Sequence, residues 1–232
     1  MIIKSSDYKY PTKEERAKIR ENCQYIEPFG FEYQSEIKMI FQDNIAFDEV
    51  KRKVDLFYWD YCLLNKLGKL MESYILLNTS YQRQSTDQTE NEEVINNYLF
   101  DYYIEIYYYY FFSARDLIAQ IINVFYGLKI EEDNVKFHNL GHKLNNKTIN
   151  IILSDFTKIT KATSDFRNSF THRYPSNYLD GRGELINRDG KVGYGFGNQT
   201  ITEPKDFISN IVESHQAMAN LVKLLKFEFV KE

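Results

Sequence analysis

The stretch that decides the fold is Ile106-Tyr-Tyr-Tyr-Tyr-Phe-Phe112, in which six aromatic residues follow one isoleucine without interruption. It lies within residues 92–128, a segment that lacks proline and is apolar on nearly every side. A helix that is hydrophobic all round belongs at the centre of a bundle or in an interface between subunits. The sequence therefore predicts a central helix here. A platform for stacking nucleic acid bases is the alternative, although aromatic stripes on helices are more often core.

Two further long amphipathic helices are predicted on either side of this segment. The first spans about 44–81 and has apolar residues in a 4-3 repeat, which consists of Val50, Val54, Phe57, Tyr61, Leu64, Met71 and Ile75. Gly68 occupies one position of this repeat, where a partner helix could approach closely. The other spans about 203–231 and is capped by Thr202. Its apolar stripe consists of Ile208, Ile211, Met218, Val222, Leu225 and Phe229, and His215 on the same stripe is expected to be a core histidine. With the motif helix described below, the chain is predicted to be all-α, an up-down bundle of about four long helices.

The remaining segments are predicted to surround this bundle. Residues 1–43 form an arm, with a short helix from Thr12 to Asn22 and an extended stretch that has a strand at 31–41. Residues 44–232 form the bundle, interrupted by a solvated polar loop at 82–93. After Pro175 the composition shifts to glycine-rich alternating runs around Asp189-Gly190, which predicts a small β-hairpin insertion within 176–202. That hairpin is either a flap over a site or a surface excursion.

Composition narrows the functional classes. The 232 residues are 43% hydrophobic with a net charge of −4, so any nucleic acid binding must use a local basic patch. No secretory signal or long apolar run is present, and Cys23 and Cys62 lack metal spacing, so a cytoplasmic protein without a membrane span is expected. His138 and His142 lie four residues apart but have no third ligand at motif spacing, so no metal is expected. The sequence contains no Walker loop or dinucleotide fingerprint, so no cofactor is expected.

A candidate site lies at the end of a predicted helix over about 146–171. Its apolar stripe is Ile149, Ile152, Phe156, Ile159, Thr163, Phe166 and Phe170. Asn168 and His172 are four residues apart and share a face that points away from this stripe, with Arg167 on the flank. Pro175 disfavours helix at Tyr174, so the helix should end there. Arginine binds phosphate oxygens with forked donors, and an imidazole can give or take a proton near neutral pH.

The spacing of these residues is weak evidence by itself, because basic residues in a last helical turn also complement the helix dipole. A second polar line, Asp116, Gln120 and Asn123, lies on the central helix beside Arg115. It is either a structural network that satisfies buried polar groups or a set that faces the motif helix and orients it.

Arg167-Asn168-x3-His172-x-Tyr174, at the end of a helix in an all-helical chain, resembles the signature of HEPN domains, closest to the toxin subgroup that has Arg-x4-His-x-Tyr. The resemblance covers about 44–175 and 203–231. It implies a metal-independent endoribonuclease, that is, a hydrolase that binds RNA. It also implies a homodimer in which the motifs of the two subunits face each other, and a role as the toxin of a toxin–antitoxin pair. Arg167 would bind the scissile phosphate, His172 would transfer a proton in attack of the ribose 2′-OH, and Asn168 would orient His172 or the substrate.

The same resemblance favours Asp116, and after it Arg115, as a supporting residue on an inner helix. Tyr174 matches the tyrosine that a partner antitoxin nucleotidyltransferase can modify. The chain departs from the toxin subgroup in its greater length, its arm, its polar loop and its hairpin. Whether it is an enzyme stays open, because some HEPN domains are non-catalytic interaction or nucleotide-binding modules.

Overall fold

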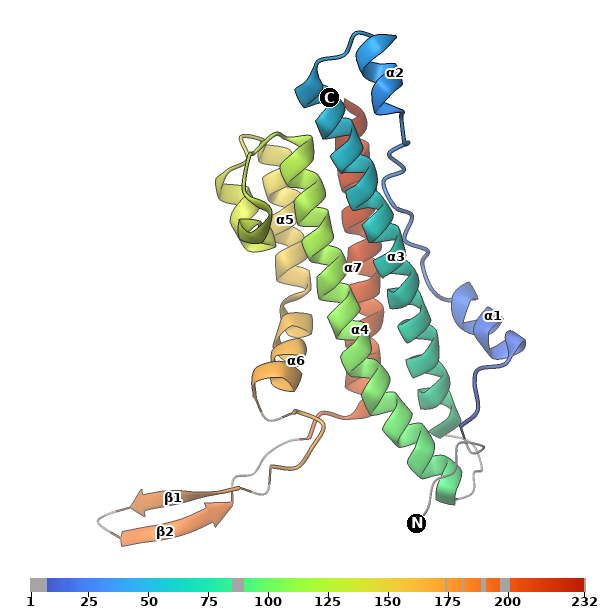
Figure 1. The fold of residues 1–232 in the computed structure, drawn as a ribbon. Helices are drawn as coiled ribbons and strands as arrows, with labels where there is room; N and C mark the ends of the chain where they lie inside the picture. The colour runs from blue at the N-terminus through green and yellow to red at the C-terminus, as the bar shows by residue number, and fades with distance from the viewer. Residues whose placement is uncertain are drawn as a thin grey trace.

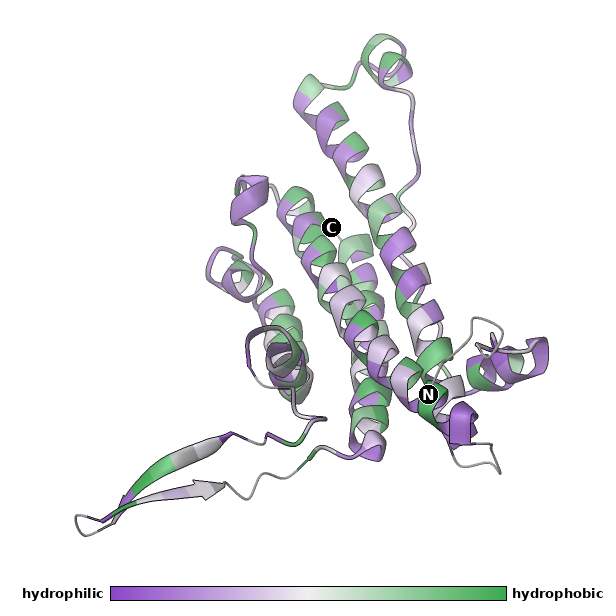
Figure 2. Ribbon diagram, turned by 60° about the horizontal axis from the view of Figure 1, so that its bottom comes forward, coloured by the Kyte–Doolittle hydropathy of each residue, from purple (hydrophilic) through white to green (hydrophobic). Residues whose placement is uncertain are grey.

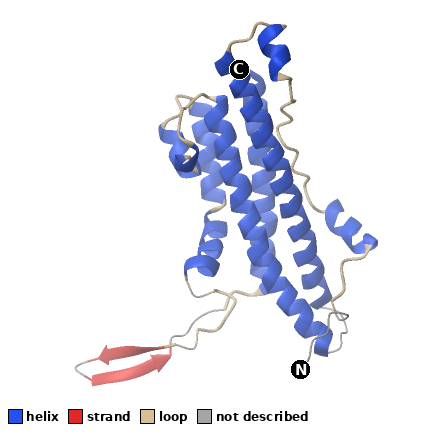
Figure 3. Ribbon diagram, in the orientation of Figure 1, coloured by secondary structure: helices blue, strands red, loops and turns tan. Residues whose placement is uncertain are grey.

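The chain folds as a bundle of long helices with one small hairpin (Figure 1). The computed structural model describes residues 8–84, 90–173, 175–180, 182–188, 191–196 and 201–231. Its elements are α1 (Lys13–Glu21), α2 (Glu36–Phe41), α3 (Phe47–Gln84), α4 (Glu90–Phe125), the short 3₁₀ helices η2 (Glu132–Asn134) and η3 (Phe137–His142), α5 (Lys147–Ile159), α6 (Lys161–His172), β1 (Gly183–Arg188), β2 (Lys191–Phe196) and α7 (Pro204–Lys231). Helix dominates the described residues, and strand within them is confined to the hairpin (Figure 3), which confirms the predicted all-α class.

Helix α4 is the centre of the bundle, as its aromatic run predicts. Helices α3 and α4 run antiparallel, α5 and α6 return along α4, and α7 lies behind them (Figure 1). Tyr107 and Tyr108 are almost fully buried. The Tyr107 hydroxyl lies 3.1 Å from the carbonyl of Ile211, and the Tyr108 hydroxyl donates to Asn210 Oδ1 over 2.9 Å. These buried rings are therefore core residues, whereas Tyr109 in the same run is 61% exposed.

The face of α3 that packs against the bundle differs from the predicted 4-3 repeat. Val50 and Ile75 are buried as expected, but Tyr61 and Leu64 are exposed. The buried seam consists of Leu56, Leu63, Leu67, Leu70, Tyr74 and Leu77. Two apolar stripes overlap on this helix, and only contact with α4 and α7 determines which of them is buried. Gly68 is exposed, and no atom lies within 4 Å of a Cβ placed there, so the predicted close approach of a helix at Gly68 is wrong.

The N-terminal segment contains one confirmed helix and one wrong prediction. Thr12 caps α1 in a capping box with Glu15, as the sequence indicates. The strand predicted at 31–41 is absent, because α2 occupies Glu36–Phe41 with Ser35 as its N-cap. The extended residues before it donate their backbone N–H groups to the Asp60 carboxylate of α3 instead of to a neighbouring strand. A local cap and a buried carboxylate replace the sheet pairing that a strand would need.

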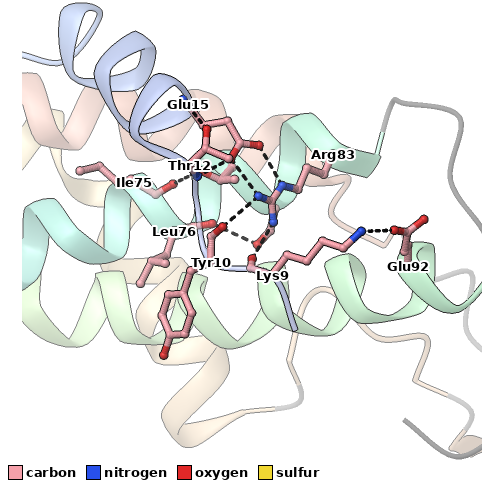
Figure 4. Close-up of polar contacts among 10 residues, drawn as sticks. Lys9, Tyr10, Thr12, Glu15, Ile75, Leu76, Arg83 and Glu92 are labelled. Atoms are coloured by element: carbon pink, nitrogen blue, oxygen red, sulfur yellow. Dashed lines mark hydrogen bonds and ion pairs between the residues drawn. The ribbon is translucent and has the colours of Figure 1, made fainter. Parts of the chain in front are cut away.

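Helix α1 and the arm before it are held to the end of α3 by an arginine clamp (Figure 4). The Arg83 guanidinium donates to the Glu15 carboxylate over 2.9 and 2.8 Å and to the carbonyls of Lys9 and Tyr10. A second pair, Arg16 with Glu72, ties α1 to α3 over 2.9 and 2.5 Å. The hydrogen bonds from Arg83 lower the pKa of Glu15, and those from Arg16 lower the pKa of Glu72.

This clamp predicts an acid-dependent stability difference. A carboxylate with a lowered folded-state pKa contributes stability above its unfolded value, near 4.5, and loses it as the pH falls through the folded-state pKa. We expect Glu15→Gln/Glu72→Gln to have a lower Tm than the wild type at about pH 7, with the difference shrinking as the pH falls below about 4.5 and disappearing below the lowered folded-state pKa values. Thermal unfolding across this range measures it, and a deficit that persists unchanged in acid would contradict the assignment.

The single motif helix predicted over 146–171 is two helices, α5 and α6, broken at Thr160. Thr160 leaves the helical region with φ −91° and ψ 17°, and its hydroxyl donates to the Phe156 carbonyl over 2.8 Å. Such a side-chain bond competes with the helix ladder and favours a bend. Most of the predicted stripe is in contact with the core, but Ile159, beside the break, is 49% exposed. Because of this break, α5 and α6 are separate helices, and α6 alone carries Arg167, Asn168 and His172.

The predicted hairpin forms, with β1 and β2 antiparallel and Arg188 paired with Lys191. Its Asp189-Gly190 turn lies outside the described residues. The hairpin projects away from the bundle (Figures 1 and 2) and exposes Leu185 and Val192. The described strands are therefore a surface excursion rather than a flap. Similarly, the predicted polar loop 82–93 is too wide, because α3 ends at Gln84 and α4 begins at Glu90.

Candidate functional site

Helix α6 presents the motif residues because its apolar side is fixed against α4 and α7. The ring centroids of Phe166 and Phe170 lie 6.2 and 6.0 Å from that of Tyr108. The same two rings lie 4.9 and 5.8 Å from Phe207 of α7. Aromatic contacts on one face set the rotation of a helix about its axis. Arg167, Asn168 and His172 therefore extend from the sides of α6 that the core does not occupy.

Arg167 is half-buried, and its guanidinium is held by a neutral group and a ring. Its Nη1 donates to Asn168 Oδ1 over 3.0 Å, and its Cζ lies 5.4 Å from the centroid of the Phe112 ring on α4. Among the described residues no carboxylate pairs with Arg167. Cation–π contact and an amide acceptor hold the guanidinium without neutralising it. Its charge is consequently available to an anionic ligand.

A second guanidinium lies over the same ring. The Cζ of Arg115 is 4.6 Å from the Phe112 centroid and 5.6 Å from that of Phe137. Arg115 donates to Asp116 Oδ1 over 3.1 and 2.8 Å, and the Asp116 side chain is 58% exposed. Within the described residues, the contacts that connect Asp116 to Arg167 run through Arg115 and the Phe112 ring. The fold thus gathers two arginines from different helices, a pairing that spacing in the sequence does not indicate.

The other two residues of the polar line on α4 have a structural role. The Gln120 amide donates to the Glu132 carbonyl over 2.9 Å. Asn123 donates to the Ile130 carbonyl and accepts from its N–H, at 2.9 and 3.1 Å. Both therefore hold the loop after α4. The expectation that Gln120 and Asn123 face the motif helix and orient it is wrong, because the loop supplies the partners that these amides need.

His172 is the last residue of α6 and is exposed. The imidazole makes no hydrogen bond or ion pair within the described part of the chain. Asn168 lies one turn earlier on the same face, whereas Arg167 is five residues away and projects at about 140° from it around the helix. Within one chain the structure therefore brings Arg167 to Asn168 and to Arg115, but not to His172. Tyr174 lies outside the described residues.

A groove beside Arg167 is the part of the site that sequence reasoning missed. It has a volume of about 350 Å³ and lies between α4 and α6, lined by Tyr102, Glu105, Ile106, Tyr109, Arg167 and Phe170, among others. The α4 residues follow helical spacing at 102, 105, 106 and 109, which could have indicated a second, outward face. Burial raises the pKa of Glu105, and the neighbouring Asp101 carboxylate raises it further. Burial likewise raises the pKa of Asp101, against the opposing effect of Asn177.

The remaining histidines do not assemble a metal site. No cluster of three or more potential ligands from His, Cys, Asp and Glu occurs among the described residues. His138 and His142 lie on η3, and both are exposed. His215 is a core histidine as predicted, with Nε2 3.0 Å from the Gln24 carbonyl and its ring 4.9 Å from that of Tyr74. Nor does any helix in the described ranges combine the length and hydrophobicity needed to cross a membrane.

An up-down helical bundle with an outward-facing arginine near a helix end is the arrangement that the HEPN resemblance implies. A family model described as Cthe2314-like HEPN matches residues 59–226. Because this match spans more than half of the chain, the protein belongs to this HEPN family. Comparisons with curated proteins and with solved structures give no match.

Proposed function

We propose that this HEPN protein is a metal-independent endoribonuclease that acts as a homodimer. Arg167 binds the scissile phosphate, His172 transfers a proton, and Asn168 holds the Arg167 guanidinium in place. Arg115 adds a second positive group, and Asp116 orients Arg115. The observation that carries this proposal is that Arg167 is fixed by Asn168 and Phe112 but has no carboxylate partner among the described residues. A positioned, uncompensated guanidinium suits a phosphodiester.

The reaction proposed is attack of the ribose 2′-OH on its adjacent phosphorus. The 2′-oxygen loses a proton to a base and bonds to phosphorus. The bond to the 5′-oxygen breaks, and that oxygen takes a proton from an acid. The products are a 2′,3′-cyclic phosphate and a free 5′-hydroxyl. The guanidinium stabilises the charge that develops on the non-bridging oxygens, and an imidazole supplies or removes the proton.

Two proton transfers require two groups, which is the reason to propose a dimer. His172 of one chain acts as base or acid, and His172 of a second copy takes the other role. The separation of Arg167 and His172 around α6 supports this arrangement, since each could serve the same phosphate from a different subunit. In the biological setting, we propose a cytoplasmic defence toxin, with Tyr174 available to an antitoxin nucleotidyltransferase.

The direct test uses purified protein, mixed single-stranded RNA and an excess of EDTA. Cleavage that survives the chelator and yields 2′,3′-cyclic phosphate ends supports the proposal. No cleavage with or without added divalent ions would exclude the nuclease. Sedimentation at micromolar concentration checks the dimer, and a protein that remains monomeric while cleaving RNA would exclude the composite site.

A second candidate is a nucleotide-binding module without catalysis. The pairing of Arg115 and Arg167 on Phe112, beside a groove that could hold one nucleotide, favours it. Calorimetry with single nucleotides tests this reading. Binding of a nucleotide by a protein that cleaves no RNA supports the module, and an absence of binding excludes it.

We expect Arg115→Ala to reduce the rate of RNA cleavage by about 10-fold, because one charge-assisted phosphate contact is lost. The cleavage rate of Arg115→Lys should lie between those of Arg115→Ala and the wild type, since lysine keeps the charge but loses the planar fork of donors. Single-turnover kinetics measure the effect. Arg20→Ala, which removes an exposed arginine on α1, is the matched control. An unchanged rate in Arg115→Ala would remove Arg115 from the site.

A further inference from the structure

The groove between α4 and α6 has features of a binding site that the phosphate chemistry does not explain. Tyr109 and Tyr102 are 61% and 51% exposed. Both rings line the groove together with Phe170. Exposed tyrosines that line one groove provide surfaces on which nucleic acid bases stack.

Lysines from a third helix lie against the same tyrosines. Lys66 Nζ of α3 is 5.6 Å from the Tyr109 centroid and 5.5 Å from that of Tyr110. Lys69 Nζ is 5.8 Å from the Tyr110 centroid. Neither ammonium pairs with a carboxylate in the described ranges. The tyrosines of α4 therefore have cations from α3 beside them, while Arg167 of α6 lies in the groove that they line. A single-stranded backbone that passes over α4 would find a positive group on each side.

Glu105 and Asp101 give part of this groove the opposite charge. Glu105 lines the groove, and Asp101 lies one helical turn away on α4. Carboxylates repel phosphate, so the phosphate belongs at the Arg167 side and a base belongs beside Glu105. An ionised carboxylate accepts hydrogen bonds through two oxygens. Guanine is the RNA base that offers two adjacent N–H donors, N1–H and N2–H, to such a pair of acceptors.

We propose that this groove binds one unpaired RNA base next to the phosphate held by Arg167, and that guanine is the preferred base. This inference rests on the proposed function for the position of the phosphate. The base stacks on Tyr109, its donor edge faces Glu105, and the neighbouring phosphate on the α3 side lies near Lys66 and Lys69. Recognition is therefore split between stacking, which tolerates any base, and one carboxylate, which selects among bases.

The experiment measures binding separately from cleavage. Full-length His172→Ala protein is titrated against fluorescent single-stranded RNA pentamers that are uridine except for one central base. We expect the guanine strand to bind about 10-fold more tightly than the adenine, cytosine or uridine strands. Glu105→Gln in the same background should remove most of this preference. Tyr109→Ala should weaken all four strands by about 10-fold, because stacking is lost.

Matched controls lie outside the groove. Glu213→Gln on α7 and Tyr58→Ala on α3 change exposed residues of the same types and should leave both affinity and preference unaltered. Equal binding of the four strands, or a guanine preference that survives Glu105→Gln, would overturn the proposal. Thermal unfolding establishes that each variant is folded.

The two failures can be told apart. If the wild type cleaves RNA but Glu105→Gln and Tyr109→Ala bind as it does, the base site is wrong and the nuclease stands. If guanine binding is found and the wild type cleaves nothing, the base site stands and the catalytic proposal is wrong.

Discussion

Replacing His172 by alanine is expected to lower the single-turnover rate of RNA cleavage by about 10² to 10⁴-fold, the usual contribution of a general acid or base. The imidazole is exposed at the end of α6 and makes no hydrogen bond in the described part of the chain. Its removal should therefore leave the Tm within about 1 °C of the wild-type value, since exposed side chains contribute little to stability. Rate and Tm measured on the same preparations separate catalysis from folding.

His138→Ala is the matched control, because His138 is also exposed and lies on η3. Cleavage by His172→Ala at the wild-type rate would exclude this histidine from catalysis. A Tm drop of several degrees would instead indicate a structural role.

A mixture of Arg167→Ala and His172→Ala proteins sharpens the test of the composite site. Each variant alone should be nearly inactive. A mixed dimer keeps one arginine from one chain and one histidine from the other, so it has a phosphate-binding group and one of the two proton-transfer groups. The mixture should therefore be more active than either variant alone, which lacks every Arg167 or every His172, but it should stay well below the wild type because the second proton transfer has lost its histidine. If the mixture is no more active than its components, the two residues do not act across a dimer.

Replacing Asp60 by alanine should lower the free energy of unfolding by about 3–5 kcal/mol, because three buried or half-buried N–H groups lose their acceptor. The carboxylate is 5% exposed and accepts from the backbones of Phe29, Gly30 and Phe31 over 2.9, 2.6 and 3.1 Å. These bonds hold the segment between α1 and α2 along α3, where the Phe29 ring packs against the Phe229 ring with centroids 5.1 Å apart. Gly30 has φ +82°, a left-handed conformation that glycine adopts readily.

Denaturant unfolding measures this loss. The free energy of unfolding of Asp60→Asn should lie between those of Asp60→Ala and the wild type. The amide keeps one acceptor oxygen but places an NH₂ group against N–H donors. Asp43→Ala, at an exposed position before α3, should change stability by less than about 0.5 kcal/mol. A loss below about 1 kcal/mol in Asp60→Ala would mean that water replaces the carboxylate.

Much of the helical framework could be predicted from the sequence, because helix caps and hydrophobic runs indicate the same helices that the structure contains. Thr12 with Glu15 marks the start of α1, and the unbroken aromatic run of α4 indicates a buried central helix. Hydrophobic period predicts that His215 lies in the core, and Pro175 predicts that the helix carrying His172 ends close to that residue. These features depend on residues within a few turns of each other, so no knowledge of distant segments is needed.

Other features depend on residues that are far apart in the chain. The sequence does not reveal that α3 buries its Leu63 stripe rather than its Tyr61 stripe, because both are apolar and the choice is made by α4 and α7. It does not reveal that Arg115 and Arg167 share the Phe112 ring, since those residues are on different helices.

The sequence by itself thus determined the helical class, the buried aromatic helix and the helix end that carries His172, since periodicity and caps are local. Only the tertiary structure decided which faces meet: it buried the Leu63 stripe of α3, turned Asp116 toward solvent, and opened the tyrosine-lined groove beside Arg167. The physical reason is that each of these depends on burial against a neighbouring helix, and burial is a property of pairs of surfaces that neither surface encodes alone.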